Sequence, residues 1–549
     1  MPEIDVQQML DRGLDHHRNG RLAEAERVYR QILAADPNQP DALHLLGLVA
    51  VQVGKAAVAV KLIEQAIARR PEFPAAWSNL GYALQAAGRR REAIDAYRRA
   101  LSFQPDLPQA CVNLGNALCE AGEAEEAIEV IRRAIEKSPE DANAHNSLGA
   151  ALRAAGRLDE AVEEFDRSLS LNPQNAEAHN NLGNALRDLD RPEEAIVHFE
   201  QSLILRPDYA QSQNNLGGAF EEQGEYDRAI ANYRRAVEMS PQFPMAHVNL
   251  GIALLRNGDF ENGWREYEWR YQDPEVAPLL RQSKRPVWDG TALNGRRLLI
   301  HAEQGLGDTI QFARYVPKVA EAGAVTFRVH PELFELMKTL PGRQQIIRMT
   351  DPLPDHDVQC PLLSLPRLMK TDLATIPATG AYLKADEEGL ARWRQRMAPH
   401  AGRRKIGLVW SGRKQYRNDR RRSIPGRLLS PLGDVPEVQL FSLQKHREEA
   451  EALDERIIDW TADLHDFADT AAMIAALDLV ISVDTSVAHL AGAAGAAVWV
   501  LLPFSSDWRW LLGRDDSPWY PTARLFRQTA PGDWRGVIDR VAAELSRTG

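Results

Sequence analysis

The stretch AAWSNLGYALQAAGRRREAIDAYRRALSFQP, residues 75–105, decides the fold of the first half of this 549-residue chain. Its apolar residues recur with helical spacing in two successive segments, and a proline follows the second. Its Leu80-Gly81 pair recurs every 34 residues, at Leu46-Gly47, Leu114-Gly115, Leu148-Gly149, Leu182-Gly183, Leu216-Gly217 and Leu250-Gly251. Counting back one period reaches Gly13, so eight units fit in residues 5–276. Such a repeat predicts a solenoid of stacked helix pairs.

The positions that decide helix packing in this unit hold mostly small, aromatic or proline residues: Trp77, Leu80, Gly81, Gly88, Ala93, Tyr97, Ala100 and Pro105. Small residues let two helices cross closely, and proline cannot continue the second helix. The pattern resembles the tetratricopeptide repeat, a pair of antiparallel helices. Seven units keep the proline, at Pro37, Pro71, Pro105, Pro139, Pro173, Pro207 and Pro241. The eighth unit departs from the pattern between Asn262 and Tyr271, and we expect it to be a cap that docks on the next domain.

A column of asparagines stands two residues before the repeat glycine. Five units carry it, at Asn79, Asn113, Asn181, Asn215 and Asn249, while Ser147 interrupts the column. Asparagine is a mediocre helix former, so its recurrence on one helical face needs a reason. One interpretation is structural, with each amide bonding a neighbouring helix. The other is an amide ladder that binds the backbone of an extended peptide independently of its sequence. A similar column lines the groove of O-linked N-acetylglucosamine transferase, which the array resembles.

Composition and charge narrow the class of protein. Hydrophobic residues make up 44% and charged residues 26%, as in ordinary globular domains. No stretch approaches the roughly 20 apolar residues that span a bilayer, and no secretory signal is visible, so we expect a cytoplasmic protein. Three cysteines, Cys111, Cys119 and Cys360, match no disulfide framework or zinc spacing. The net charge of -11 combines an acidic first half with a mildly basic second half, and neither half is expected to bind nucleic acid.

The second half of the chain alternates between predicted strands and helices. Apolar runs predict strands at 297–302, 325–329, 357–362, 405–410, 438–443, 479–483 and 498–502. A helix is expected from about Thr309 to Ala322. The pattern restarts near residue 400, so we expect two α/β units with a cleft between them.

Glycines follow the first predicted strand, in Gly305-Leu306-Gly307-Asp308. Glycine lets a backbone approach a ligand, and the N-terminus of the following helix favours an anion. The alternative is an ordinary turn with Asp308 as the helix N-cap, since the third glycine of the dinucleotide fingerprint is missing.

A basic loop follows the strand that ends at Trp410. It holds Arg413, Lys414, Arg417, Arg420, Arg421, Arg422 and Arg427 against one acid, Asp419. Guanidinium and ammonium groups in such a loop can bind phosphate oxygens. The alternatives are a solvated basic loop and a nucleic-acid patch, and the second is disfavoured because Tyr416 is the one aromatic residue in the run.

A third constellation follows strand 479–483, where residues 484–493 read DTSVAHLAGA. A helix begins at once, so the amides near Thr485 and Ser486 are expected to point from the carboxyl edge of the sheet toward a ligand. His489 lies one turn into this helix and can face the same anion, although a lone helical histidine is more often a packing residue.

Residues 296–545 resemble the glycosyltransferase family that includes the ADP-heptose:lipopolysaccharide heptosyltransferases, which have the GT-B fold of two Rossmann-like subdomains. The resemblance rests mainly on Gly305–Asp308 and Asp484–His489, although the family usually has glycine where Ser486 stands. It implies that Asp308 is the catalytic base. It also implies a set of donor-binding residues, which includes a basic residue of the loop after Trp410, for which Arg413 and Lys414 are the candidates. The other residues of this set are Gly305, Gly307, Gln444, Asp484, Thr485, Ser486 and His489.

The predicted domains are a tetratricopeptide array at 1–276, a linker at 277–295, an acceptor-side GT-B subdomain at 296–396 and a nucleotide-sugar-side subdomain at 397–549. This plan resembles bacterial tetratricopeptide-containing glycosyltransferases, including those proposed to modify flagellin. The resemblance implies a transferase that moves a sugar from a nucleotide-sugar to a Ser or Thr hydroxyl of a protein held by the array. The nucleotide-sugar is a co-substrate, and the reaction is expected to need neither a metal ion nor a cofactor. The alternatives are a nonenzymatic adaptor with a degenerate GT-B domain and a transferase acting on lipopolysaccharide or polysaccharide.

One aromatic run near the C-terminus has two interpretations. It comprises Trp508, Trp510, Trp519 and Tyr520. These side chains either line the sugar or acceptor cleft or form a hydrophobic seam between the subdomains.

Overall fold

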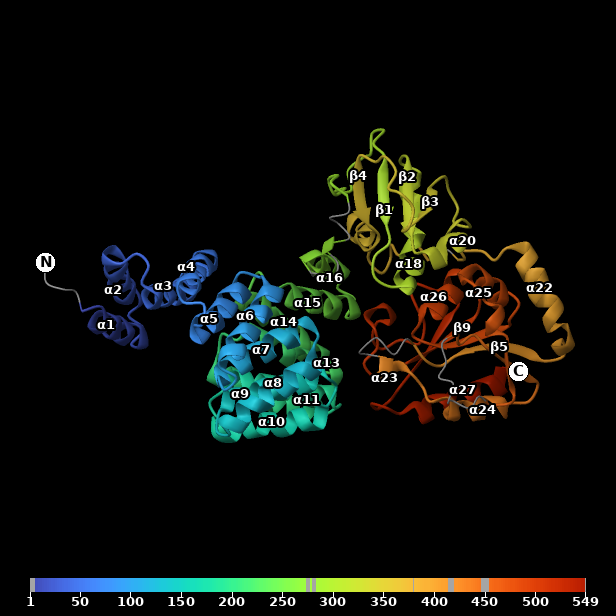
Figure 1. The fold of residues 1–549 in the computed structure, drawn as a ribbon. Helices are drawn as coiled ribbons and strands as arrows, with labels where there is room; N and C mark the ends of the chain where they lie inside the picture. Colours follow the sequence, from blue (N-terminus) through green and yellow to red (C-terminus); the bar gives the residue numbers. More distant parts are fainter. Residues whose placement is uncertain are drawn as a thin grey trace. The chain divides into compact units, whose positions relative to one another are not determined.

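The computed structural model describes residues 5–272, 277–278, 283–378, 380–412, 419–445 and 454–548 (Figure 1). It consists of two compact units, Met1–Ala219 and Phe220–Gly549. The division falls inside the repeat array, within helix α13. The last repeat helices therefore belong to the same unit as the α/β region.

The repeat array consists of antiparallel helix pairs. Within the described residues its sixteen helices are α1 (Val6–Arg18), α2 (Leu22–Ala35), α3 (Pro40–Gln52), α4 (Ala56–Arg69), α5 (Pro74–Ala86), α6 (Arg90–Phe103), α7 (Pro108–Ala121), α8 (Ala124–Lys137), α9 (Ala142–Ala154), α10 (Leu158–Leu171), α11 (Ala176–Asp188), α12 (Pro192–Leu205), α13 (Ala210–Glu222), α14 (Tyr226–Met239), α15 (Pro244–Arg256) and α16 (Phe260–Tyr267). In the first unit, successive first helices also pack on one another, α3 on α5, α5 on α7, α7 on α9 and α9 on α11. They therefore form one continuous face of the solenoid.

The repeat glycine is required by the packing inside each pair. A Cβ placed on Gly81 would lie 2.6 Å from the ring of Tyr97, which is fully buried on the partner helix. Gly115 and Gly149 meet Ile131 and Phe165 in the same way. Any side chain at these positions would push the two helices apart.

The second unit contains two parallel sheets. The first has the order β3-β2-β1-β4, with β1 (Leu298–His301), β2 (Val325–Val329), β3 (Gln345–Arg348) and β4 (Val358–Pro361). The second has the order β10-β9-β8-β5-β6-β7, with β5 (Arg404–Val409), β6 (Val438–Ser442), β7 (Ile457–Asp459), β8 (Leu479–Val483), β9 (Val498–Leu502) and β10 (Ala523–Arg527). In register, Leu298 lies opposite Val325 and Val358, and Ile406 opposite Leu440 and Leu479.

Short helices connect these strands. The α-helices are α18 (Leu306–Phe312), α19 (Val316–Ala320), α20 (Phe334–Met337), α21 (Leu365–Leu368), α22 (Glu387–Met397), α23 (Asp419–Arg422), α24 (Ser430–Gly433), α25 (Phe467–Ile474), α26 (Ser486–Ala493) and α27 (Trp534–Thr548). The 3-10 turns are η1 (Glu268–Gln272), η2 (Ala313–Tyr315), η3 (Pro331–Leu333), η4 (Leu362–Ser364), η5 (Ala398–His400), η6 (Gly426–Leu429), η7 (Thr461–Asp463) and η8 (Trp508–Trp510). Among the described residues, no helix is long and apolar enough to cross a membrane.

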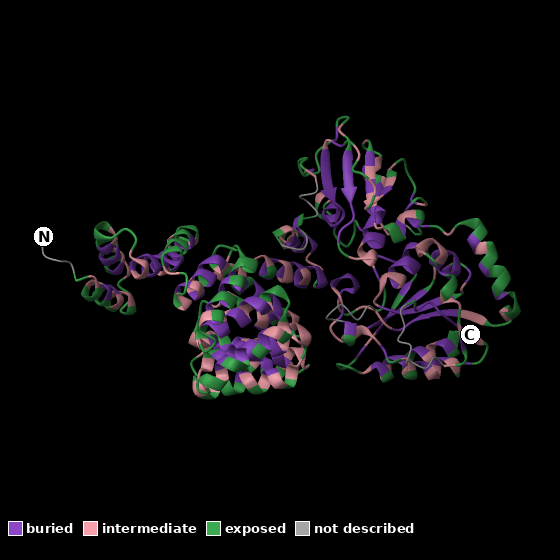
Figure 2. Ribbon diagram, in the orientation of Figure 1, coloured by how far each residue is buried: buried purple, intermediate pink, exposed green. Residues whose placement is uncertain are grey.

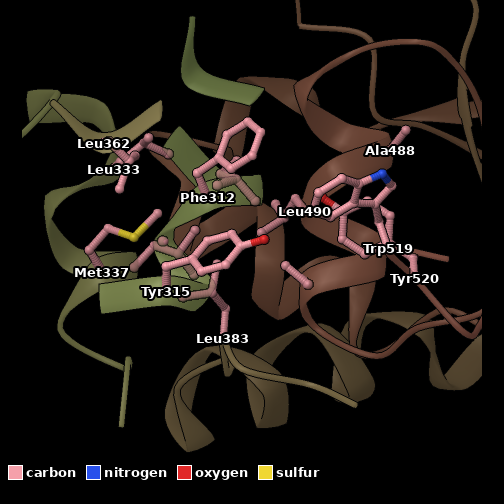
Figure 3. Packing of buried hydrophobic residues seen from close by; sticks show 14 of the residues in the cluster. Phe312, Tyr315, Leu333, Met337, Leu362, Leu383, Ala488, Leu490, Trp519 and Tyr520 are labelled. Atoms are coloured by element: carbon pink, nitrogen blue, oxygen red, sulfur yellow. The ribbon is translucent and has the colours of Figure 1, made fainter. Parts of the chain in front are cut away.

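The central strands are buried on both faces, as Figure 2 shows. One hydrophobic core joins the two sheets: Phe312 and Tyr315 belong to the same buried cluster as Leu490, Trp519 and Tyr520 (Figure 3). This core explains the aromatic run, because its four rings are all nearly inaccessible and none lines the cleft described below. The structure thus supports the hydrophobic seam.

The last repeat helices are part of this core. Trp264 of α16 makes an edge contact with Trp508, with ring centroids 5.2 Å apart, and its indole N–H donates to the carbonyl of Thr371 at 3.2 Å. Arg270 of η1 forms a buried ion pair with Glu303 at 2.9 Å. The end of the array is therefore built into the α/β region of the second unit.

All seven predicted strands are present, and three further strands, β3, β7 and β10, were not predicted. The prediction of one helix from about Thr309 to Ala322 is wrong, because both ends differ and the segment is divided into separate helices. The helix begins at Leu306 and gives way to η2 before α19. Pro317 accounts for the interruption, because it has no N–H to donate to the preceding turn.

Candidate functional site

The two sheets of the second unit face a cleft of about 1030 Å³. It lies beyond the carboxyl ends of β1, β5 and β8, since the segments after these strands line it. In the second sheet the chain order reverses between β5 and β8, which is where open parallel sheets bind ligands. Every described residue predicted to act in catalysis or donor binding lines this cleft: Gly305, Gly307, Asp308, Gln444, Asp484, Thr485, Ser486 and His489.

The turn after β1 is held by Asp308. Its Oδ2 accepts a hydrogen bond of 2.9 Å from the backbone N–H of Gly305, so Asp308 stabilises the start of α18 from inside the helix. The neighbouring Gln304 has a positive φ of 60°, and its side chain hydrogen-bonds the hydroxyl of Tyr267. A non-glycine residue in this conformation is strained, and such strain is typical of functional turns.

Gly307 lets α18 approach α26. A Cβ at this position would lie 3.0 Å from Cδ2 of His489 and 3.5 Å from Cα of Ser486. The glycine therefore leaves room for this close contact, since an added methyl group would press on the His489 ring. The two sequence motifs that carried the prediction, one from each sheet, come into direct contact at this point.

Arg509 joins the two sides of the cleft. Its guanidinium forms ion pairs with Asp308, which is 201 residues away in sequence, and with Asp507 at 2.9 Å. Burial raises the pKa of the Asp308 carboxyl, and the charge of Arg509 offsets this effect in part. Burial acts to raise the pKa of Asp507, but the charge of Arg509 and its two hydrogen bonds to Asp507 together lower this pKa below its usual value.

The start of α26 lies beside a buried carboxyl and a buried histidine. Burial and the negative charge of Asp507 raise the pKa of Asp484 to about 6, while Arg422 opposes the shift. Burial and the charge of Arg509 lower the pKa of His489 to about 3, so its imidazole is neutral. The ring stacks on Trp510, and its Nδ1 lies 3.0 Å from the hydroxyl of Tyr520. His489 is thus held as a packed, uncharged ring at the edge of the cleft.

Two residues position the loops around β5. Arg422, at the end of α23, donates to the backbone carbonyl of Asp484 at 3.0 Å. The side-chain carbonyl of Gln444 accepts from the backbone N–H groups of Trp410 and Ser411 at 3.2 and 3.0 Å. Gln444 therefore supports the loop after β5 from within the cleft. The predicted phosphate ligands Arg413 and Lys414 lie outside the described residues.

The asparagine column forms hydrogen bonds between successive repeats. Nδ2 of Asn181 donates to Asn146 at 3.0 Å, and Nδ2 of Asn215 donates to Asn180 at 2.9 Å. Asn79 lies 2.5 Å from the ring nitrogen of His44, and each of these partners is 35 residues earlier. Asn113 instead accepts from Gln109 on its own helix at 3.0 Å. All five asparagines, Asn249 included, are half-buried. The structural interpretation of the column therefore has direct support, and the binding of acceptor peptide stays a prediction.

Sequence reasoning missed Arg509 and Asp507. Their signal was an Asp-Trp-Arg-Trp run, in which a charged pair is embedded between large apolar rings. Such a pair is costly to bury unless it is matched, so the run indicated a partner elsewhere in the chain. The partner, Asp308, could not be identified from spacing.

Tetratricopeptide-repeat family models match residues 6–49, 44–108, 112–176 and 174–242. Protein FlbA of Caulobacter vibrioides is 30% identical over an alignment of 315 positions, which covers 52% of this chain and 52% of FlbA. The chain thus spans about half the length of this relative.

Solved structures of repeat proteins are also similar to this chain. The Cut9–Hcn1 hetero-tetramer of APC/C shows 19% identity and a TM-score of 0.39, covering 48% of this chain and 52% of that one. A thermophilic tetratricopeptide protein of Thermus thermophilus shows 25% identity and a TM-score of 0.31, covering 33% and 100%. The family matches and the helix pairs together identify the first half of the chain as a tetratricopeptide-repeat array, a scaffold suited to binding a partner protein.

Proposed function

We propose that this chain is a glycosyltransferase of GT-B architecture that moves a sugar from a nucleotide-sugar to a Ser or Thr hydroxyl of a protein held by the repeat array. The observation that supports it most is the convergence of Gly305–Asp308 and Asp484–His489 on one cleft. A volume of about 1030 Å³ is ample for a nucleotide-sugar, given that small-molecule sites are about 300–1,000 Å³.

The cleft offers groups for each part of the reaction. The amides at the start of α26, together with Arg422 and Arg509, would stabilise the charge that develops on the departing phosphate. Asp308 would accept the proton of the acceptor hydroxyl while the acceptor oxygen bonds to the anomeric carbon. The bond from that carbon to phosphate breaks, and its electron pair leaves with the nucleoside diphosphate. The raised pKa of Asp308 makes it a better proton acceptor.

The repeat array would supply acceptor binding away from the chemistry, which raises affinity by tethering. An asparagine amide has two N–H donors and two acceptor sites. The bond that it makes to the preceding repeat therefore leaves hydrogen-bonding capacity for a peptide backbone. Flagellin is an acceptor suggested by the family resemblance described above.

The experiment combines donor turnover with acceptor labelling. Purified chain is incubated with a panel of nucleotide-sugars and host proteins, and released nucleoside diphosphate and protein mass shifts are measured. Asp308→Asn should lose transfer and keep donor binding, whereas Asp539→Asn, the same change in an exposed pair with Arg535, should be silent. Full transfer by Asp308→Asn would refute the assignment of the base.

A second candidate, a nonenzymatic adaptor that senses a nucleotide-sugar, is favoured by one observation. Both carboxylate oxygens of Asp308 are engaged, one by the Gly305 N–H and the other by Arg509. A base in this state is not free to take a proton. Tight donor binding without release of nucleoside diphosphate in any acceptor mixture would establish the adaptor.

A further inference from the structure

We propose that Arg509 has two alternative partners, the carboxylate of Asp308 and a phosphate group of a nucleotide bound at the start of α26, so that nucleotide binding releases Asp308. The identity of the ligand as a nucleoside diphosphate rests on the proposed function. The exchange of partners would explain how a carboxylate with both oxygens engaged becomes available as a base.

Arg509 is placed and equipped for a second partner. It lines the cleft together with Thr485 and Ser486, although only 9% of its side chain is exposed. Asp507 anchors it twice, through the backbone N–H at 3.0 Å and through Nη1 at 2.9 Å. Its Nε is buried and has no hydrogen-bond partner among the described residues. A buried guanidinium N–H without an acceptor is unfavourable, so a turn of the Arg509 guanidinium that brings Nε to a phosphate oxygen in the cleft would be favoured.

The start of α26 supplies the other half of the anion site. Thr485 is the N-cap of α26. Among the described residues, the Thr485 side chain accepts no capping hydrogen bond from the first backbone N–H groups of this helix. The contact between Gly307 and His489 brings this helix terminus next to the turn that carries Asp308. Arg509 also acts electrostatically on both Asp484 and His489, as expected for a side chain close to α26.

The exchange has a direct consequence for Asp308. Once the guanidinium turns to phosphate, the carboxylate loses its ion pair with Arg509 while it stays buried beside the Gly305 N–H. A buried carboxylate without a counter-ion binds a proton more strongly. Base strength would then appear only when the leaving group is in place.

Pyrophosphate binding to the full chain tests this competition by calorimetry. Asp308→Asn removes the competing partner and should tighten pyrophosphate binding about fivefold or more, because Arg509 becomes available. Asp539→Asn removes the same charge from a remote pair and should leave affinity unchanged. Arg509→Gln should weaken binding about tenfold. When Asp308→Asn is added to the Arg509→Gln variant, the gain in pyrophosphate affinity should be less than half of the gain that Asp308→Asn gives in the unchanged chain.

Arg509→Lys is the second test, because Arg509→Gln removes the ion-pair partner of both Asp308 and Asp507 and can impair folding. Lysine lacks the planar guanidinium fork with which Arg509 binds two partners. In the Arg509→Lys background, the gain in pyrophosphate affinity caused by Asp308→Asn should therefore again be smaller than in the unchanged chain. The proposal is overturned if pyrophosphate does not bind, if Asp308→Asn fails to tighten binding, or if the gain is the same with and without Arg509. Tightening without turnover of any nucleotide-sugar would support the exchange and reject the transferase. Turnover of a nucleotide-sugar without tighter pyrophosphate binding by Asp308→Asn would support the transferase and reject the exchange.

Discussion

At the scale of single residues, Gly307 controls how closely the two sides of the cleft approach. A methyl group here must displace His489 or α26, since its carbon would lie 3.0 Å from the His489 ring, closer than normal contact. We expect Gly307→Ala to cost about 1–3 kcal/mol of unfolding free energy and to weaken pyrophosphate binding. Gly402→Ala is the matched control, because a Cβ at Gly402 meets no atom of the described residues within 4 Å. Urea unfolding and calorimetry of both variants check this, and equal behaviour would contradict it.

Asp484 gives a prediction of pH dependence. Its pKa is raised by burial from 3.8 to about 6, so the folded state binds a proton more tightly than the unfolded state. This contribution to stability is fully present below about pH 4 and is lost as pH rises through about 6. Asp484→Asn should therefore gain stability relative to the unchanged chain over this range, by up to about 3 kcal/mol at pH 7.

Urea titrations of both chains from pH 4 to pH 7.5 measure this difference. The quantity to compare is the difference in unfolding free energy between the Asp484→Asn variant and the unchanged chain at each pH. Burial lowers the pKa of His489, so this residue makes the stability of both chains rise with pH over part of the same range. A difference in unfolding free energy that does not change with pH would contradict the assignment.

Much of the candidate site could be predicted from the sequence, because its two motifs each follow a strand directly. The rule that the carboxyl ends of parallel strands hold ligands pointed to Gly305–Asp308 and Asp484–His489, and the family resemblance supplied the roles predicted for them. The spatial reason for Gly307 and the pairing of Arg509 with Asp308 could not be predicted, because both depend on contacts between segments far apart in the chain. The asparagine column allowed two interpretations because an amide suits either role.

At the scale of elements, the three unpredicted strands share a position. β3, β7 and β10 are all edge strands, and each contains exposed residues. A strand that is buried on both faces has a continuous apolar run, whereas an edge strand does not need one. These three edge strands were therefore not visible in the sequence, whereas the fourth edge strand, β4, is buried along its whole length and was predicted.

The turn η1 supports the loop that enters the cleft. Arg270 binds both oxygens of Glu303, which directly precedes Gln304, and the pair is almost completely buried. Arg270→Ala leaves the Glu303 carboxylate without its partner, and we expect a loss of about 3–5 kcal/mol of unfolding free energy together with weaker pyrophosphate binding. Arg265→Ala removes an exposed arginine from the adjacent helix and should cost little. Thermal unfolding of the two variants distinguishes them, and comparable losses would argue against a special role for the pair.

At the scale of the whole molecule, the chain should not separate at the end of the repeats. Trp264 and Tyr267 belong to the same core as both sheets. A chain of residues 220–549 should therefore unfold cooperatively and bind pyrophosphate, whereas residues 277–549 should do neither, because part of their core is missing. Circular dichroism on heating checks this. Cooperative unfolding of residues 277–549 would show that the last repeat is dispensable.

The three hydrogen bonds that the asparagine column makes to a preceding repeat each join positions 35 residues apart, one unit plus one residue. Duplicating residues 176–209 recreates the junction, because Asn180 and Asn181 are then repeated 34 residues further along the chain. A change of any other length breaks the junction. The number of repeats is thus a quantity that gene duplication adjusts in fixed steps of 34 residues, while the last repeat, which belongs to the second unit, stays unchanged.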